Sequence, residues 1–293
     1  MKIRIGFHMS IAGSVANAPL NAGKAGYGAL QMFVSNSRSW NSKQINDSDI
    51  SLFKSYIKEF DIKPYAHMPY LCNPSSPNSE VFRKSVSMMK DNIEKCSTLG
   101  IPYIVLHPGS HLGKGFDYAM KRISSAISEA LDLDARCSIL LENEAGYKNS
   151  VGSKISELAN LIDFIDDKRL GVCFDTCHAF AAGYDISKED TIQHLMDEID
   201  EFIGTQKVKL VHLNDARYGL GSGLDRHWHI GRGSIGVNGF INFFKFMRFN
   251  TDSFIMETPV TENFGEAENA IAAIRIIKKA LGKGALWENS ANI

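Results

Sequence analysis

The feature that most constrains the fold of this sequence is a regular alternation between short apolar runs and longer stretches with helical periodicity. Near-continuous apolar strands that alternate with helices are typical of a parallel sheet covered by helices. Eight such units predict a single closed (β/α)8 TIM barrel, with an open doubly wound sheet as the alternative. No G-x-G-x-x-G motif follows the first run, which argues against a dinucleotide site.

The predicted strands are short and rich in apolar, β-branched or aromatic residues. They span Ile3–Phe7, Ala29–Val34, Lys63–Ala66, Tyr103–Leu106, Ser138–Leu141, Leu170–Phe174, Val208–Val211 and Phe254–Met256. The helical stretches between them include Asp49–Phe60, Glu80–Leu99, Asp117–Leu133, Lys154–Ile165 and Lys188–Ile203. We expect residues 1–284 to form one barrel domain and residues 285–293 to form a peripheral tail.

Ionisable side chains stand at the ends of seven of these runs. All strand ends of a parallel barrel lie on one rim, and this rim carries the active site in essentially every characterised barrel enzyme. The residues at the run ends are His8, His67, His107, Glu142, Asp175, His212 and Glu257. Further along the same loops come His178, Asp225, His227 and His229. Residues far apart in the sequence are therefore predicted to meet at one mouth.

Metal ions are the natural partners for such a gathering of histidines and carboxylates. A single histidine at a strand end is more often a satisfied core or capping residue. Many ionisable groups gathered without a counter-charge would each be costly to bury. Nitrogen and carboxylate ligands without thiolates suit zinc, manganese or iron. One ion takes about three to five protein ligands, so this pool predicts roughly two or three metal ions in one cluster.

The composition is typical of a soluble globular protein, but it does not show what the protein binds. The chain has 293 residues, of which 44% are hydrophobic and 22% charged, as in an ordinary soluble globular protein. Its formal net charge of −1 argues mildly against a nucleic-acid binder, but bound cations would offset their carboxylate ligands. No apolar run approaches the roughly 20 residues that span a bilayer. The first residues enter a strand-like pattern without a signal peptide, so we expect a cytoplasmic protein.

The cysteines are too scattered for a disulfide framework. There are five of them, and the odd number also argues against full pairing. Cys173 and Cys177 are spaced C-x-x-x-C, which fits neither a zinc ribbon nor a thioredoxin-type motif. We therefore expect all five to be buried, reduced core residues.

Several motifs carry a resemblance to a known family. They are Gly6-Phe7-His8-Met9-Ser10 with Ala12-Gly13, His107-Pro108-Gly109-Ser110-His111, the run from Val172 through Asp175-Thr176-Cys177-His178 to Tyr184, His212-Leu213-Asn214-Asp215, and Asp225-Arg226-His227 followed by Ile230-Gly231 and Gly233-Ser234-Ile235-Gly236. On these motifs the chain resembles the endonuclease IV family of apurinic/apyrimidinic endonucleases. They extend from the first predicted strand to the last, so the resemblance covers nearly the whole chain.

The resemblance implies three zinc ions per chain, with manganese or iron as alternatives at some positions. The ligands of the first would be His67, His107 and Glu142. The second would share Glu142 and add Asp175, His212 and Glu257. The third would be held by His178, Asp225 and His227. Glu142 and Glu257 are the expected catalytic residues. The family pattern makes neither His8 nor His229 a ligand, and His8 is expected to orient a ligand or a phosphate.

The resemblance also implies a substrate and a reaction. The family hydrolyses the phosphodiester on the 5′ side of abasic sites in double-stranded DNA, which leaves a 3′-hydroxyl and a 5′-deoxyribose phosphate. Zinc suits this reaction because it lowers the pKa of bound water to about 7. Trimming of blocked 3′ ends is expected as a second activity. We expect a monomer that has no membrane partner.

Recognition of the lesion would come from loops on the same rim. By likeness to the family, Arg38, Tyr70 and Leu71 would enter the DNA, and Arg226 would also contact it. An aromatic and an apolar side chain can replace the stacking that is lost when a nucleotide is displaced. One departure concerns the segment after Glu142. The family commonly reads N-x-A-G-Q-G there, whereas this chain carries Tyr147 in place of the glutamine. Tyr147 could stack in its place, or the loop could be built differently.

Two other functions are compatible with parts of this pattern. A sugar isomerase or epimerase on the same barrel would also use rim histidines and carboxylates, usually with one or two metals, and fold alone cannot exclude it. The set His178, Asp225 and His227 and the Tyr70-Leu71 pair argue against it. A non-catalytic binder of damaged DNA, with zinc only stabilising the fold, is the second alternative, and the intact ligand set argues against it.

Overall fold

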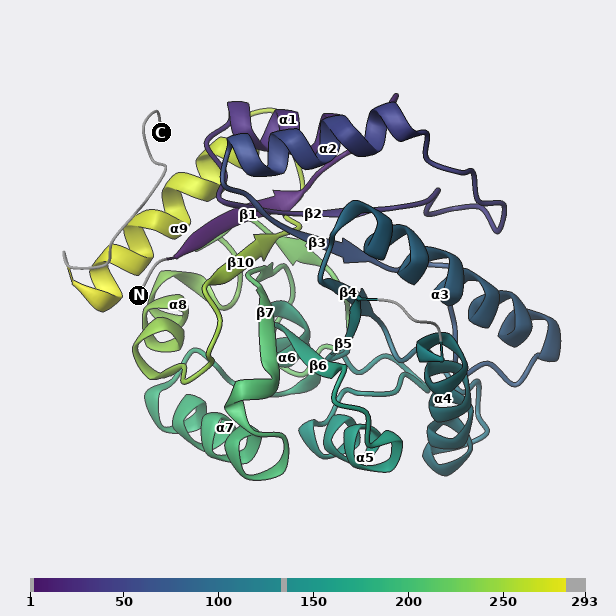
Figure 1. Cartoon of the computed structure of the whole chain (residues 1–293). Helices are drawn as coiled ribbons and strands as arrows, with labels where there is room; N and C mark the ends of the chain where they lie inside the picture. The colour runs from purple at the N-terminus through teal and green to yellow at the C-terminus, as the bar shows by residue number, and fades with distance from the viewer. Residues whose placement is uncertain (1–2, 133–135, 283–293) are drawn as a thin grey trace.

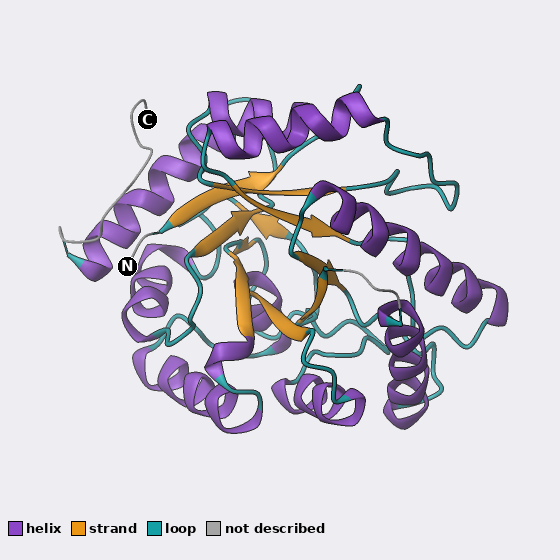
Figure 2. Cartoon of the chain, viewed as in Figure 1, coloured by secondary structure: helices purple, strands orange, loops and turns teal. Residues whose placement is uncertain are grey.

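The computed structural model describes residues 3–132 and 136–282 of the chain. Its centre is a closed barrel whose eight strands follow the order β1-β10-β7-β6-β5-β4-β3-β2, with helices around it (Figures 1 and 2). β1 pairs in parallel with β10 on one side and with β2 on the other, so the sheet has no open edge there. The predicted (β/α)8 barrel is confirmed, and the doubly wound alternative is wrong.

The strands and helices alternate along the chain as the sequence predicts. The barrel strands are β1 (Arg4–His8), β2 (Ala29–Phe33), β3 (Lys63–His67), β4 (Tyr103–Leu106), β5 (Ser138–Glu142), β6 (Leu170–Asp175), β7 (Val208–His212) and β10 (Ser253–Met256). The α-helices are α1 (Asn17–Lys24), α2 (Asp47–Glu59), α3 (Ser79–Leu99), α4 (Phe116–Leu131), α5 (Ile155–Ile165), α6 (Thr176–Ala182), α7 (Glu189–Phe202), α8 (Gly236–Phe246) and α9 (Glu266–Leu281), and a 3-10 turn, η1 (Thr205–Lys207), precedes β7.

Helix boundaries shift by a residue or two from the predicted ones, for local reasons. The side chain of Asn46 accepts a hydrogen bond from the backbone N–H of Asp49, so α2 begins at Asp47 rather than at Asp49. α3 ends where Gly100 adopts a left-handed conformation with φ of 78°. Leu133, the last residue of the predicted helix that corresponds to α4, lies outside the described residues, as does the predicted tail 285–293.

The strands bury both of their faces. A ring of side chains that includes Tyr65, Val105, Leu140 and Leu210 fills the inside of the barrel. The outward faces join the larger core that the helices cover. At Gly6 of β1 a Cβ atom would lie only 1.9 Å from the carbonyl oxygen of Ala29, so the strands can approach here only because this residue has no side chain.

An ion cluster ties the strand starts together at the opposite end from the candidate site. The Nζ of Lys63 lies 2.8 Å from the Oδ1 of Asp252, just before β10. The Nε of Arg4 lies 3.8 Å from the Oδ2 of the same carboxylate. Asp252 thus links the start of β3 to the start of β1, beside the β1–β10 seam that closes the barrel.

The segment after β7 contains a small hairpin where the sequence predicts only a loop. β8 (Asp215–Ala216) pairs antiparallel with β9 (His227–Trp228). The carboxylate of Asp215 accepts hydrogen bonds from the backbone N–H groups of Ala216, Gly233 and Ile235. These bonds fix the hairpin to the following loop and so hold Asp225 and His227 over the barrel mouth. Among the described residues, no helix is long and apolar enough to cross a membrane.

Candidate metal centre

The strand ends bring histidine rings from distant parts of the sequence into contact. The ring centroids of His67 and His107 are 5.1 Å apart, although the two residues end β3 and follow β4. His178, in the first turns of α6, lies 5.8 Å from His107 and 5.3 Å from His227 on β9. The predicted meeting of these side chains at one mouth is therefore seen in the structure.

Glu142, the last residue of β5, lies at the centre of this cluster. Its side chain is 1% exposed. One carboxylate oxygen lies 3.3 Å from the Nε2 of His67 and 3.2 Å from the Nε2 of His107. The other lies 2.8 Å from the Nδ1 of His212 at the end of β7. A single carboxylate therefore faces two sets of nitrogen donors, one from each oxygen.

Three groups of ligand atoms have the composition of a metal site. In each group the candidate donor atoms all lie within 4.8 Å of one another. The groups are His67, His107 and Glu142; Glu142, Asp175, His212 and Glu257; and His178, Asp225 and His227. These are the nine residues that the family resemblance implies, in the same three sets.

Two further groupings include a cysteine. Cys173 lies near Glu142 and His212, and Cys177 near Asp175 and His227. Burial raises the pKa of the Cys173 thiol to about 12, and burial also raises the pKa of Cys177. Cys173 belongs to the apolar ring inside the barrel. All five cysteines are free and buried, as predicted, and the donor set without thiols describes the site better.

The charges in the cluster call for cations. Burial lowers the pKa of a histidine, yet Glu142 and Glu144 raise the pKa of His107 to about 9. Burial acts in the same downward sense on His178, but Asp175 and Asp225 raise its pKa well above the ordinary value. The buried carboxylates therefore stabilise positive charge next to the histidine rings. Either protons on the rings or metal ions bound between rings and carboxylates can supply this charge.

Hydrogen bonds to backbone carbonyls determine which nitrogen of His67 and of His178 is free to bind a metal ion. The Nδ1 of His67 lies 2.7 Å from the carbonyl oxygen of Met68, and the Nδ1 of His178 lies 2.9 Å from that of Asn143. A carbonyl oxygen only accepts hydrogen bonds, so Nδ1 carries the proton in both neutral rings and Nε2 carries a lone pair.

Two of the ring nitrogens at the centre of the cluster have no hydrogen-bond partner. They are the buried Nε2 atoms of His178 and His227. That of His178 instead faces the Oδ1 of Asp225 at 3.2 Å. A lone pair facing a carboxylate fits an intervening cation, so the residues fit a metal cluster.

Comparison with known proteins gives the family. Residues 20–280 match the family described as a xylose isomerase-like TIM barrel. The chain is 41% identical to the probable endonuclease 4 of Nitrosopumilus maritimus, with 91% of this chain and 97% of that protein covered. It is 43% identical to the probable endonuclease 4 of Methanoculleus marisnigri, with 93% and 98% covered. The crystal structure of endonuclease IV from Thermus thermophilus superposes with a TM-score of 0.81 at 34% identity, over 95% of this chain and 98% of that one.

The chain belongs to the endonuclease IV family. The predicted family and enzyme class, an apurinic/apyrimidinic endonuclease, are confirmed. A D-tagatose 3-epimerase-like protein also superposes, with a TM-score of 0.70 at 20% identity over 95% of this chain and 97% of that one. At this identity the likeness shows the barrel fold alone, which endonuclease IV proteins share with sugar epimerases.

Two tyrosines predicted to contact DNA flank the cluster. Tyr70, 70% exposed, stands edge-on to Phe33 at 5.3 Å, and Tyr147 is 42% exposed. Both line a cavity of about 240 Å³ together with His107 and Asp225. The structure therefore brings residues of the candidate metal groups and these two aromatic rings to one mouth.

Two more of the predicted DNA contacts lie beside this mouth. Leu71 is half-buried next to Tyr70. Arg226 is exposed, and its guanidinium donates to the carbonyl oxygen of Asp225 at 2.6 Å. Leu71 and Arg226 are therefore the sequence neighbours of Tyr70 and Asp225, which both line the cavity.

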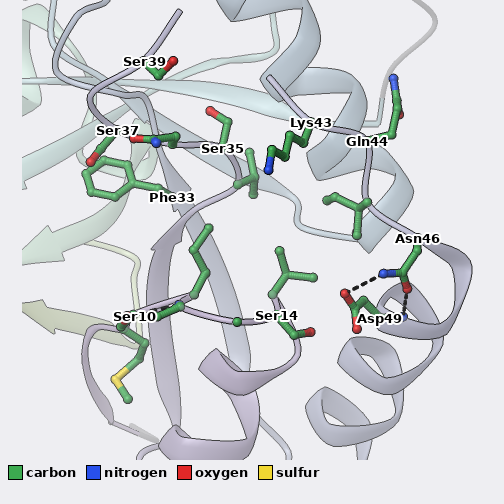
Figure 3. A pocket seen from close by; sticks show the side chains of 18 of the residues that line it. Ser10, Ser14, Phe33, Ser35, Ser37, Ser39, Lys43, Gln44, Asn46 and Asp49 are labelled. Carbon is green, nitrogen blue, oxygen red and sulfur yellow. Dashed lines mark hydrogen bonds between the residues drawn. The ribbon is translucent and has the colours of Figure 1, made fainter. Parts of the chain in front are cut away.

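Arg38 lies farther out, on a loop that walls a neighbouring cavity. This cavity of about 1010 Å³ extends from His8 between the β1–α1 loop and the β2–α2 loop (Figure 3). Figure 3 shows Ser10 and Ser14 on one wall and Ser35, Ser37, Ser39 and Lys43 on the other. Ser37 and Ser39 are the sequence neighbours of Arg38, which is exposed. The polar groups that line the cavity are mainly hydroxyls and amides, together with His8, Lys43 and Asp49.

The other two histidines of the predicted pool occupy different surroundings. The Nδ1 of His8 lies 3.2 Å from the Oε1 of Glu257, so His8 contacts a candidate ligand. His229 is 3% exposed and its Nε2 lies 3.1 Å from the Oγ1 of Thr261, with its ring 4.6 Å from that of Phe264. His229 is therefore a packing residue of the outer wall.

Several polar residues that support the cluster are not among those predicted from the sequence. Glu144, 3% exposed, lies 2.8 Å from the Nδ1 of His107. Asn214 donates to the Oδ2 of Asp175 and accepts from the backbone N–H of Glu257, both at 2.8 Å. Gln31, fully buried, contacts both His212 and Glu257. For Gln31, the signal in the sequence was a polar residue inside an apolar run. For Glu144 and Asn214, it was a polar residue that lies two positions after a predicted ligand, Glu142 or His212.

Proposed function

We propose that this protein hydrolyses the phosphodiester bond on the 5′ side of abasic nucleotides in double-stranded DNA. The observation that carries the proposal is the placement of three histidine–carboxylate groups beside a cavity that Tyr70 and Tyr147 line. The names of the relatives, probable endonuclease 4, support it. The products would be a 3′-hydroxyl and a 5′-deoxyribose phosphate.

The proposed cofactors are three zinc ions, with manganese or iron as alternatives at some positions. The nine residues of the three groups would hold them, with Glu142 shared between the first and the second. When bound, such ions supply a water of lowered pKa and neutralise charge on the phosphoryl oxygens. The donor set supports zinc because it consists of imidazoles and carboxylates only.

The reaction adds the oxygen of water to phosphorus and breaks the bond from phosphorus to the 3′ oxygen, which leaves with a proton. Glu142 and Glu257 are the proposed catalytic residues. The Glu142 side chain is 1% exposed, which suits a fixed shared ligand, whereas that of Glu257 is 16% exposed and can face the substrate. His8 contacts Glu257 and would hold its carboxylate in place.

Lesion recognition is proposed for the exposed residues around the mouth. Tyr70, Leu71 and Tyr147 would fill the space left in the base stack, since an aromatic ring stacks on any base. Arg38 would enter the DNA at the lesion with Tyr70 and Leu71. Arg226 would contact the backbone, because a guanidinium pairs well with phosphate. The same mouth would accept a blocked 3′ end, where the same bond type is cut, so 3′-end trimming is proposed as a second activity.

The proposal is tested with a duplex oligonucleotide that carries one tetrahydrofuran abasic analogue, beside an undamaged duplex. The analogue cannot undergo β-elimination, so any cut is hydrolytic. We expect one nick on the 5′ side of the analogue with an extendable 3′-hydroxyl, none in the undamaged duplex, and loss of cutting with a chelator. Metal-replete protein that leaves the analogue intact would overturn the proposal.

A further inference from the structure

Gln31 is a buried polar residue in the middle of a barrel strand. It is fully buried, and the other members of β2 are the apolar residues Ala29, Leu30, Met32 and Phe33. A primary amide in such a place needs hydrogen-bond partners for both of its ends. In the structure it finds them among the candidate metal ligands.

The contacts of Gln31 fix which way its amide points. Its Nε2 lies 2.8 Å from the Oε1 of Glu257, and its Oε1 lies 2.8 Å from the Nε2 of His212. An ionised carboxylate only accepts hydrogen bonds, so the amide NH2 must be the end that faces Glu257. The amide oxygen then faces His212 and requires a proton on that Nε2.

The same contacts leave the opposite nitrogen of His212 free for coordination. With the proton on Nε2, the neutral ring carries its lone pair on Nδ1. This Nδ1 lies 2.8 Å from Glu142, 3.4 Å from Glu257 and 3.8 Å from Asp175, measured to the nearest carboxylate oxygens. A lone pair surrounded by carboxylate oxygens is favourable only where a cation lies between them.

We propose that Gln31 is a positioning residue, which selects the tautomer of His212 and holds Glu257 so that both face the same cation. The inference rests on the metal cluster of the proposed function and not on the identity of the DNA lesion. Only an amide serves both partners, because it donates to the carboxylate and accepts from the ring. A methionine has a similar length and provides neither hydrogen bond. A glutamate could accept from His212 but would repel Glu257.

The first test measures the tautomer in the unaltered protein. Nitrogen-15 NMR of the zinc-loaded protein with labelled histidine distinguishes a ring protonated on Nε2 from one protonated on Nδ1. The His212 signals are assigned by their absence from a His212→Gln variant. We expect the proton on Nε2 and the zinc-bound signal on Nδ1. A proton on Nδ1 of His212 would overturn the inference, whatever the enzyme cuts.

The second test measures metal affinity in a Gln31→Met variant by competition with a chelator, using zinc and, for its visible spectrum, cobalt. Partners that orient a metal-bound histidine typically change affinity by roughly 10–100-fold. We expect one bound ion to be weakened to that extent and the cobalt spectrum to change. Gln206→Met, at an exposed glutamine of η1, is the matched control and should bind all ions as the unaltered protein does.

The outcomes separate this inference from the proposed function. Wild-type affinity for every ion together with an unchanged cobalt spectrum in Gln31→Met would overturn the role of Gln31. Unaltered protein that shows the expected tautomer and metal content but leaves the abasic duplex intact would overturn the proposed function alone. A Gln31→Glu variant that keeps the Nε2 proton of His212 and binds every ion as tightly as the unaltered protein would overturn the role of the amide in holding Glu257.

Discussion

The carboxylate of Asp175 accepts a hydrogen bond at 2.8 Å from the backbone N–H of His178, so one candidate metal ligand caps the helix that carries another. Asp175 is the last residue of β6, and α6 begins directly after it. Its other oxygen, Oδ2, lies 3.4 Å from the Nε2 of His227. Asp175, a member of the second candidate group, therefore contacts the third group twice: one oxygen accepts from the backbone of His178, and the other faces the ring of His227.

This double role predicts different results for two substitutions of Asp175. Asparagine caps a helix about as well as aspartate, so Asp175→Asn should keep the fold but lose a charged ligand. A loss of about 4 kcal/mol of transition-state stabilisation corresponds to about 1000-fold slower cleavage of the abasic duplex. Asp175→Ala should lose the cap as well and unfold about 1 kcal/mol more easily than Asp175→Asn. Denaturant unfolding of the metal-free variants measures the difference, and equal stability would contradict the capping role.

Glu142→Gln should nearly abolish cleavage, because one carboxylate faces two groups of nitrogen donors. The amide keeps the size of the side chain but removes a charge from both groups. Metal analysis of the purified variant should show fewer bound ions than the unaltered protein. Near-normal turnover with the full metal content would contradict the shared role of Glu142.

Tyr147→Ala should weaken binding to abasic DNA without changing metal content. Stacking of an aromatic side chain on a base contributes about 1–3 kcal/mol, so we expect roughly tenfold weaker binding. Fluorescence anisotropy of a labelled tetrahydrofuran duplex, titrated with the metal-loaded protein, measures it; a methylene group replaces the scissile 3′ oxygen so that the duplex cannot be cut. Tyr147→Phe is the matched control and should bind almost normally. Loss of a metal ion in Tyr147→Ala would show that this loop supports the cluster instead.

Asp252→Asn should lower stability in a pH-dependent way. Burial raises the pKa of Asp252, but the hydrogen bonds from Lys63 and Ser253 and the charges of Lys63 and Arg4 together outweigh it and hold that pKa below its ordinary value. A carboxyl whose pKa is lowered on folding stabilises the protein above the ordinary pKa of about 3.9 and ceases to do so as the pH falls through the folded value. We expect the variant to lose about 0.5–1 kcal/mol of unfolding free energy at pH 7. The difference between the two proteins should shrink as the pH falls from about 3.9 through the lower folded pKa of Asp252, and a difference that stays constant over this range would contradict the ion cluster.

The sequence alone predicts the barrel and the residues at its rim, because ionisable residues directly after apolar runs mark the ends of parallel strands. It cannot predict side-chain directions. His8 and His229 both belong to the predicted pool, yet one contacts Glu257 and the other packs against Phe264. Position near the rim does not show whether a ring turns inward or outward.

The supporting residues escaped prediction for a different reason. Gln31 lies 181 residues from His212 in the sequence, and only the closure of the barrel brings them to 2.8 Å. The β8–β9 hairpin has only two residues in each strand, which is too short for a period-two pattern to show. Both features depend on the path of the chain rather than on any local signal.

The contact between His8 and Glu257 spans 249 residues of sequence across the β1–β10 seam. A chain emerging from the ribosome at about 5–20 residues per second presents the first of these side chains well before the second exists. The cluster is therefore incomplete throughout synthesis and is assembled only when the last barrel strand docks. Nascent or truncated chains would lack a working set of ligands, so the order of synthesis itself would keep unfinished molecules from cutting DNA.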